Sequence, residues 1–143
     1  MEIIIKYFVI FVLFSFLGWL YEYMLFNRDI PFEATKKLFG INLYLLPIYG
    51  VGGIILLFIY ENIRQYGILV SIISAVLLLN SMECISGLLS YNFYHYKTWN
   101  YNETLIPFCY GYTSIVTAIW WGFLSYLFFV VMDFIKKKYV YLI

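Results

Sequence analysis

The chain has 143 residues, of which 64% are hydrophobic and only 12% charged, and its net charge at neutral pH is +1. A soluble domain is about 45–50% apolar and about 25% charged, so this composition excludes an ordinary soluble fold. The small net charge also excludes the basic patch typical of a nucleic-acid-binding protein. We therefore expect an integral membrane protein whose main partner is the lipid bilayer.

Four long apolar runs predict the structural elements. A helix needs about 20 apolar residues to cross a hydrocarbon core about 30 Å thick. Runs of this kind cover about residues 3–26, 41–60, 67–91 and 106–132. They are continuously apolar, which favours helices over the alternating strands of a barrel. We predict an all-α polytopic membrane protein, a bundle of about four transmembrane helices with short loops, forming a single transmembrane domain over residues 1–143.

The first run carries a carboxyl group near its end, at Glu22. A charged side chain at the bilayer centre costs roughly 2.5–3.5 kcal/mol, so such groups usually face the bundle interior or a water-filled cavity. Ser15, Gly18 and Glu22 follow one another at helical spacing and share a face, with Trp19 beside it. We expect this face to point inward.

The second run begins with residues 46–53, LPIYGVGG. Proline and three glycines weaken a regular helix and let a backbone or a ligand approach closely. Tyr49 lies in the middle of this segment. We expect it near the intramembrane carboxyl groups.

The third run contains the second intramembrane carboxyl group, Glu83, on a face that it shares with Asn80, Cys84 and Gly87. Counted along their helices, Glu22 and Glu83 both lie in the half of the membrane nearer the first and third loops. We predict that the two carboxyl groups line one cavity with Tyr49 nearby and share or retain a proton, because neither is well solvated. The candidate counter-cations are Arg28 and Lys97.

The third loop, residues 94–103, alternates aromatic residues with hydrogen-bonding residues. Such a pattern is typical of an interfacial aromatic belt. The alternative is an ordered cap over the carboxyl groups, formed by residues 99–102 and packed near residues 47–50. Trp99 and Asn100 are then candidate binding residues.

The fourth run has small residues at spacings of three and four, a pattern that lets membrane helices pack closely. Cys84 and Cys109 have no CxxC pair and no neighbouring histidine. We expect two free, packed thiols, with no metal site and no cofactor.

Basic residues give the expected orientation. With four spans both termini lie on one side, where five Lys and Arg residues compare with four on the other side. Three of the five, Lys136 to Lys138, directly follow the last run as a topology signal. We predict a multi-pass protein of the cell membrane with both termini cytoplasmic, and the small margin leaves dual topology open.

Several of these segments together resemble a family of small bacterial membrane proteins catalogued as type IV ABC-transporter permeases. The matching segments are residues 18–22 (GWLYE), 47–52 (PIYGVG), 83–87 (ECISG) and 99–101 (WNY), followed by Gly111 and by Trp120 or Trp121. Asn100 departs from the aspartate that we expect in the family's Trp-Asp-Tyr pattern. The resemblance implies a role in transport.

The leading hypothesis is a transporter or permease-type subunit with a polar pocket built around Glu22, Glu83, Tyr49, Trp19, Asn80, Trp99 and Asn100. The chain has no G-x-x-x-x-G-K-[ST] motif, so an ATP-driven role requires a separate ATPase chain. We expect a homodimer if the substrate crosses between copies. The alternatives are a non-transporting adaptor that binds another membrane protein and, less favoured, a membrane-embedded enzyme acting on a lipid-like substrate.

Overall fold

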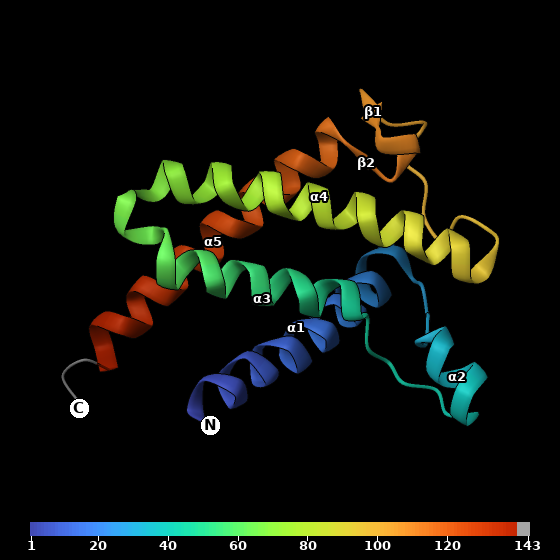
Figure 1. Ribbon diagram of the computed structural model, residues 1–143, viewed down its shortest axis with the longest axis horizontal. Coiled ribbons are helices and arrows are strands. Elements are labelled where there is room, and N and C mark those ends of the chain that lie inside the picture. Colours follow the sequence, from blue (N-terminus) through green and yellow to red (C-terminus); the bar gives the residue numbers. More distant parts are fainter. Residues whose placement is uncertain (140–143) are drawn as a thin grey trace. The chain divides into compact units, whose positions relative to one another are not determined.

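The computed structural model describes residues 1–139, and residues 140–143 of the expected domain lie outside this range. The chain divides into two units, Met1–Leu57 and Phe58–Ile143, and the boundary falls within the third helix. The elements, in the order shown in Figure 1, are α1 (Glu2–Phe26), α2 (Glu33–Phe39), α3 (Pro47–Asn62), η1 (Arg64–Tyr66), α4 (Ile68–Tyr94), β1 (Pro107–Phe108), η2 (Cys109–Gly111), β2 (Thr113–Ser114) and α5 (Ile115–Tyr139).

Within residues 1–139, three helices are long and apolar enough to cross a membrane, namely α1, α4 and α5. The helical membrane class is therefore confirmed. The expected second span is a shorter apolar helix of 16 residues, α3, so the structure shows three full-length candidates rather than four. It begins at Pro47 and not at residue 41 as predicted, because proline lacks the backbone N–H and is favoured in the first turn of a helix.

In the first unit, α1 packs directly against the beginning of α3. A Cβ atom at Gly50 would overlap the hydroxyl group of Ser15 and the Phe11 side chain, and one at Gly53 would overlap the ring of Phe14. The N–H of Leu46 donates a hydrogen bond of 3.0 Å to the carbonyl oxygen of Ser15. The small residues therefore allow close helix packing within this unit.

The first loop contains a helix that the sequence analysis did not predict, α2. It ends at Gly40, which has a φ of 66° and donates its N–H to the carbonyl oxygen of Lys36. This left-handed conformation is nearly free of strain only for glycine, so Gly40 terminates the helix.

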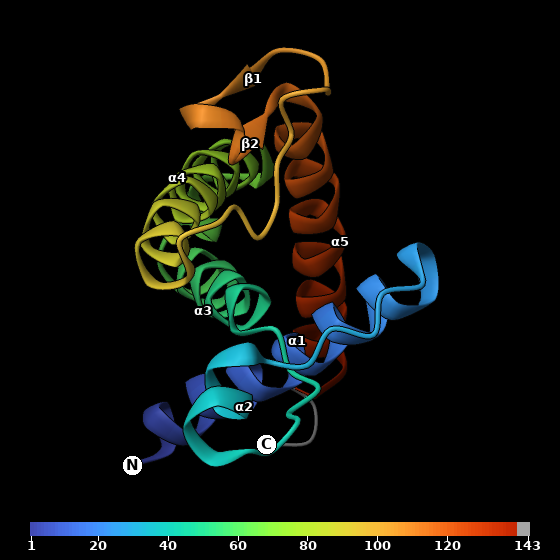
Figure 2. The ribbon, with the colours of Figure 1, turned by 90° about the vertical axis from the view of Figure 1, so that its right-hand side faces the viewer.

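In the second unit, α4 and α5 pack against each other, and the chain between them forms a short antiparallel hairpin. Figure 2 shows the two strands, β1 and β2, beside α4 and the beginning of α5. The predicted start of the fourth helix near residue 106 is therefore wrong, because α5 begins at Ile115. Ile106, Cys109 and Tyr110 all have positive φ values, which a right-handed helix cannot accommodate.

The opposite end of the second unit is fixed by an ion pair. Nη2 of Arg64 in η1 donates a hydrogen bond of 2.7 Å to Oδ2 of Asp133 in α5. Lys136, Lys137 and Lys138 occupy the last turn of α5 at this end, where cations also favour the negative end of the helix dipole.

Candidate functional site

The polar face of α4 packs against the hairpin and the beginning of α5. Asn80, Glu83 and Gly87 on this face are buried, and Glu83 is only 6% exposed although it is a carboxylic acid inside an apolar helix. The side chains of Thr113, Thr117 and Trp121 lie within hydrogen-bonding reach of its carboxyl group. Glu83 is thus held among neutral donors.

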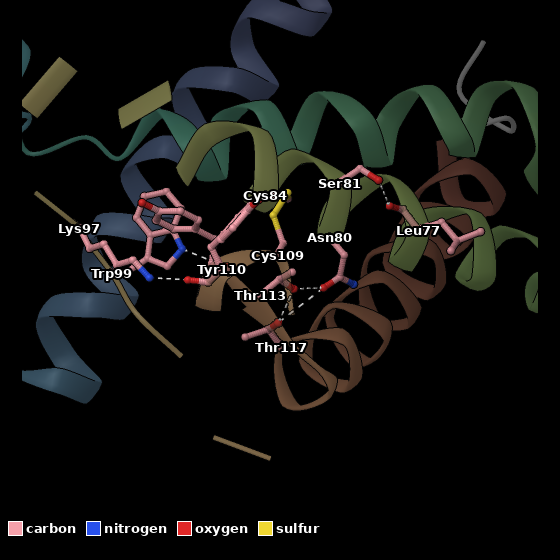
Figure 3. The surroundings of a disulfide bond; sticks show 11 residues. Leu77, Asn80, Ser81, Cys84, Lys97, Trp99, Cys109, Tyr110, Thr113 and Thr117 are labelled. Carbon is pink, nitrogen blue, oxygen red and sulfur yellow. Dashed lines mark hydrogen bonds between the residues drawn. A yellow bond between two sulfur atoms is a disulfide. The ribbon is translucent and has the colours of Figure 1, made fainter. Parts of the chain in front are cut away.

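A hydrogen-bond network continues from these donors to Asn80. The hydroxyl of Thr113 donates to Oδ1 of Asn80, and Nδ2 of Asn80 donates to the carbonyl oxygen of Val76 at 2.8 Å. The hydroxyl groups of Thr113 and Thr117 are 3.0 Å apart. Figure 3 shows Asn80, Thr113 and Thr117 converging from α4, β2 and α5. Every member of this network is uncharged.

No cation compensates the Glu83 carboxyl group within residues 1–139. No lysine or arginine forms an ion pair with it, and its Oε2 atom is buried without a hydrogen-bond partner. An unpaired carboxylate in a poorly solvated site is costly, so such a group binds a proton or a cation when it is functional. We call Glu83, Asn80, Thr113, Thr117 and Trp121 the Glu83 cluster.

The hairpin is covalently attached beside this cluster. The expectation of two free thiols is wrong, because Cys84 of α4 and Cys109 of η2 form a disulfide across 25 positions of the sequence (Figure 3). Their Cα atoms are 5.8 Å apart, within the usual range for such a bond. One helical turn further along α4, the ring of Tyr112 occupies the space beside Gly87, which has no side chain.

The third loop packs onto the same hairpin. Nε1 of Trp99 donates a hydrogen bond of 3.0 Å to the carbonyl oxygen of Tyr112. Lys97 donates to the carbonyl oxygen of Tyr110 (Figure 3). Oδ1 of Asn100 accepts the backbone N–H of Asn102 at 3.0 Å. Trp99 is therefore held by the hairpin, Asn100 bonds within the third loop, and Lys97 contacts a carbonyl group of the hairpin segment. Their expected capping of residues 47–50 stays a prediction.

The other carboxyl group, Glu22, belongs to the first unit. The hydroxyl of Tyr49 in α3 donates a hydrogen bond of 2.8 Å to Oε1 of Glu22 in α1. Nη1 of Arg28 lies 4.0 Å from Oε2 of the same carboxylate, on a mostly exposed side chain. The Tyr49 ring occupies the space beside Gly18, where a larger side chain would not fit. Because Gly18 has no side chain, the Tyr49 hydroxyl group can reach Glu22. Glu22, Tyr49 and Arg28 form what we call the Glu22 cluster.

Trp19 lies among aromatic rings. Its centroid is 5.1 Å from that of Tyr44, 5.5 Å from that of Tyr23 and 5.7 Å from that of Phe16. Its Nε1 is buried without a hydrogen-bond partner within residues 1–139. These contacts give Trp19 a packing role, and a role in binding stays a prediction.

The structure thus brings Glu22 together with Tyr49, and Glu83 together with Asn80. The two carboxyl groups belong to different units, and the expected single cavity stays a prediction. The sequence analysis missed Thr113, Thr117 and Trp121 as neighbours of Glu83. The four-residue spacing of Thr117 and Trp121 was a usable signal, because it places both on one face of α5, whereas Thr113 belongs to β2.

These features define the class of the molecule: an α-helical membrane protein with two carboxyl-centred polar clusters on its apolar helices. Residues 9–143 match the family described as "Putative ABC-transporter type IV", and the chain belongs to this family. The resemblance seen in the sequence motifs is therefore confirmed. No curated protein and no solved structure matches the chain.

Proposed function

We propose that this chain is the membrane subunit of a transporter and that the Glu83 cluster binds a proton or a cationic solute during transport. The observation that carries this proposal is the uncompensated Glu83 carboxyl group, 6% exposed, with Oε2 unpartnered within residues 1–139. Membership of an ABC-transporter-related family supports a transport role. The Glu22 cluster, in which Arg28 already faces the carboxylate, is a separate polar site within the first unit.

The irregular backbone beside α4 supports a polar route. Non-helical backbone at membrane depth is tolerated only where protein buries it or where it lines a water-filled cavity. Thr113 is 1% exposed and Ser114 is fully buried, and the disulfide from Cys109 attaches this segment to α4. Such broken segments beside membrane helices commonly form the substrate or ion sites of transporters.

The adaptor hypothesis loses its main support in the sequence. Small residues, through which an adaptor could pack against another membrane protein, are used for packing within the chain, as Gly50 is against Ser15 and Gly87 is against Tyr112. Gly122 of α5 likewise faces Val76 of α4, with a Cβ position 3.4 Å from a Val76 methyl group. We therefore favour transport over an adaptor role.

The proposal can be tested with the full chain in proteoliposomes under an imposed membrane potential. Entry of protons is followed with a trapped pH-sensitive dye, and entry of cations with a panel of labelled monovalent ions and organic amines. We expect a flux that falls at least about tenfold in Glu83→Gln, because removing an ionisable group that binds the solute directly costs more than about 1.4 kcal/mol. Ser81→Ala is the matched control, because Ser81 is exposed on α4 and bonds only within its own helix. Equal flux in the wild type, Glu83→Gln and empty vesicles for every solute would refute the proposal.

The proposed transport function also implies a partner chain and an orientation of the protein in the membrane. An ATP-driven cycle requires a separate ATPase chain, which should copurify with the tagged protein from its native membrane. We also propose that the hairpin lies outside the cytoplasm, because disulfides persist in oxidising compartments, and that the lysines at the end of α5 lie inside. Both termini are cytoplasmic if α3 crosses the membrane as well, which reporter fusions at each terminus would test.

A further inference from the structure

A charged groove lies at the end of the second unit that is remote from the Glu83 cluster along α4 and α5. It has a volume of about 740 Å³ and is open to the outside. Residues from the last turn of α3, from η1 and from the last turns of α5 line it: Tyr60, Glu61, Arg64, Gln65, Asp133, Lys136 and Lys137. The proposed transport function does not use any of them.

One of the two acidic residues that line this groove, Asp133, is already paired. Asp133 accepts the 2.7 Å hydrogen bond from Arg64, and the hydroxyl of Tyr60 also bonds to its carboxylate. The Tyr60 ring is in turn stacked on Phe129, with centroids 6.5 Å apart. This arrangement neutralises Asp133 and holds the guanidinium group in place at the groove wall.

Donors remain available after this ion pair has formed. The ion pair uses Nη2 of Arg64, and Nε of Arg64 is buried and cannot reach a ligand, so the donors that remain available belong to the two lysines of the lining. Lys136 and Lys137 are both exposed at the rim. Glu61 is the only other acidic residue of the lining, so basic groups outnumber acidic ones. The groove therefore complements an anion that has several acceptor oxygens.

The position of the groove along α5 indicates which molecule supplies that anion. A helix of 25 residues is about 37 Å long at about 1.5 Å per residue, which exceeds a hydrocarbon core of about 30 Å. The last turn of α5 therefore reaches the layer of lipid headgroups. Basic pockets between membrane helices at this depth bind phosphorylated headgroups.

We propose that this groove binds the phosphate of an anionic glycerophospholipid headgroup through Lys136 and Lys137, with Arg64 fixed beside them by Asp133. The site is independent of the proposed transport function. It distinguishes Lys136 and Lys137 from the adjacent Lys138, which does not line the groove.

The test measures lipid binding to the full chain in detergent by native mass spectrometry. Phosphatidylglycerol and phosphatidylcholine with identical acyl chains are compared at equal concentrations. We expect the anionic lipid to be retained more tightly. Lys136→Gln and Lys137→Gln should each weaken its binding about fivefold, which corresponds to about 1 kcal/mol per basic residue near an anionic surface.

Lys138→Gln is the matched control, because it removes the same charge from the adjacent residue. It should change the affinity for the anionic lipid less than about twofold, well below the effect expected for a lysine that contacts the headgroup. Loss of affinity in Lys138→Gln equal to that in the other two variants would show general charge attraction and overturn the proposal. Equal retention of phosphatidylcholine would overturn it too. Competition by inorganic phosphate at concentrations comparable to the lipid would instead indicate a soluble anion and reject the lipid as the occupant.

Discussion

The ring of Tyr112 lies where a Cβ atom of Gly87 would be, so the hairpin packs directly on the backbone of α4. Gly87→Ala would force the ring away, and overpacking of this kind costs about 1–3 kcal/mol. We expect the variant to unfold at a lower temperature than the wild type in the same detergent. Its proton or cation flux should fall as well, because the hairpin carries Thr113.

Gly122→Ala is the control for this change. The added methyl group would meet Val76 at 3.4 Å, an ordinary contact, and alanine is favoured over glycine in a helix by about 0.5–1 kcal/mol. This variant should be at least as stable as the wild type. A Gly87→Ala protein with wild-type stability would contradict the packing of Tyr112 on α4.

The extent of α1 and α4 could be predicted from hydropathy to within three residues, because both are uninterrupted apolar runs. The beginning of α5 could not, because the hairpin residues Ile106 and Phe108 are as apolar as helix residues. Hydropathy measures how favourably a side chain transfers into the membrane. It does not indicate whether the backbone at that residue has the φ angle of a helix. Pro107 was the local sign that a helix had not yet begun.

Only the α4 side of the Glu83 cluster could be predicted from the sequence. The face formed by Asn80, Glu83 and Gly87 follows from helical spacing alone, and all three residues are buried. Their partner Thr113 and the disulfide partner Cys109 come from a segment that folds back on α4. Such contacts depend on the path of the chain between the two helices, which composition and periodicity do not determine.

The hydrogen bond between Tyr49 and Glu22 gives a second prediction. Tyr49→Phe removes the hydroxyl group but keeps the ring that fills the space beside Gly18. We expect a loss of about 0.5–2 kcal/mol in the free energy of unfolding, since interhelical hydrogen bonds in membranes are worth about this much. Thermal or chemical denaturation in detergent measures it.

Tyr23→Phe is the matched control, one position from Glu22 on α1. Its ring stacks on Trp19, and its hydroxyl group forms no hydrogen bond within residues 1–139. This change should leave the stability within about 0.5 kcal/mol of the wild type, as is usual for substitutions away from such contacts. Equal losses in both variants would mean that the Tyr49 hydroxyl makes no specific contribution.

The disulfide between Cys84 and Cys109 predicts the response to thiol reagents. The denatured but unreduced protein should not react with a maleimide, and the reduced protein should react at two positions. Cys84→Ser combined with Cys109→Ser should lose about 3 kcal/mol of stability, as expected for a closed loop of this length. Labelling of unreduced protein at both positions would show that the bond is absent.

The last prediction concerns Asn100, where the family pattern led us to expect aspartate. Its Oδ1 atom accepts the N–H of Asn102, and a carboxylate can accept the same bond. Asn100→Asp should therefore fold like the wild type, whereas Asn100→Leu should lose about 0.5–1.5 kcal/mol with the hydrogen bond. Denaturation of the two variants side by side checks this. Equal destabilisation by Asp and Leu would show that the amide group itself is required.

The Cys84–Cys109 bond also has a consequence for biogenesis. The bond can form only in copies whose hairpin has reached an oxidising compartment, since thiols on the cytoplasmic side are kept reduced. If the chain crosses the membrane four times, as the sequence predicts, the basic residues are nearly balanced between the two faces and give the insertion machinery little guidance. The presence of the Cys84–Cys109 disulfide in a copy therefore reports the direction in which that copy was inserted. The fraction of copies in a cell that contain the disulfide measures how uniform the insertion direction was.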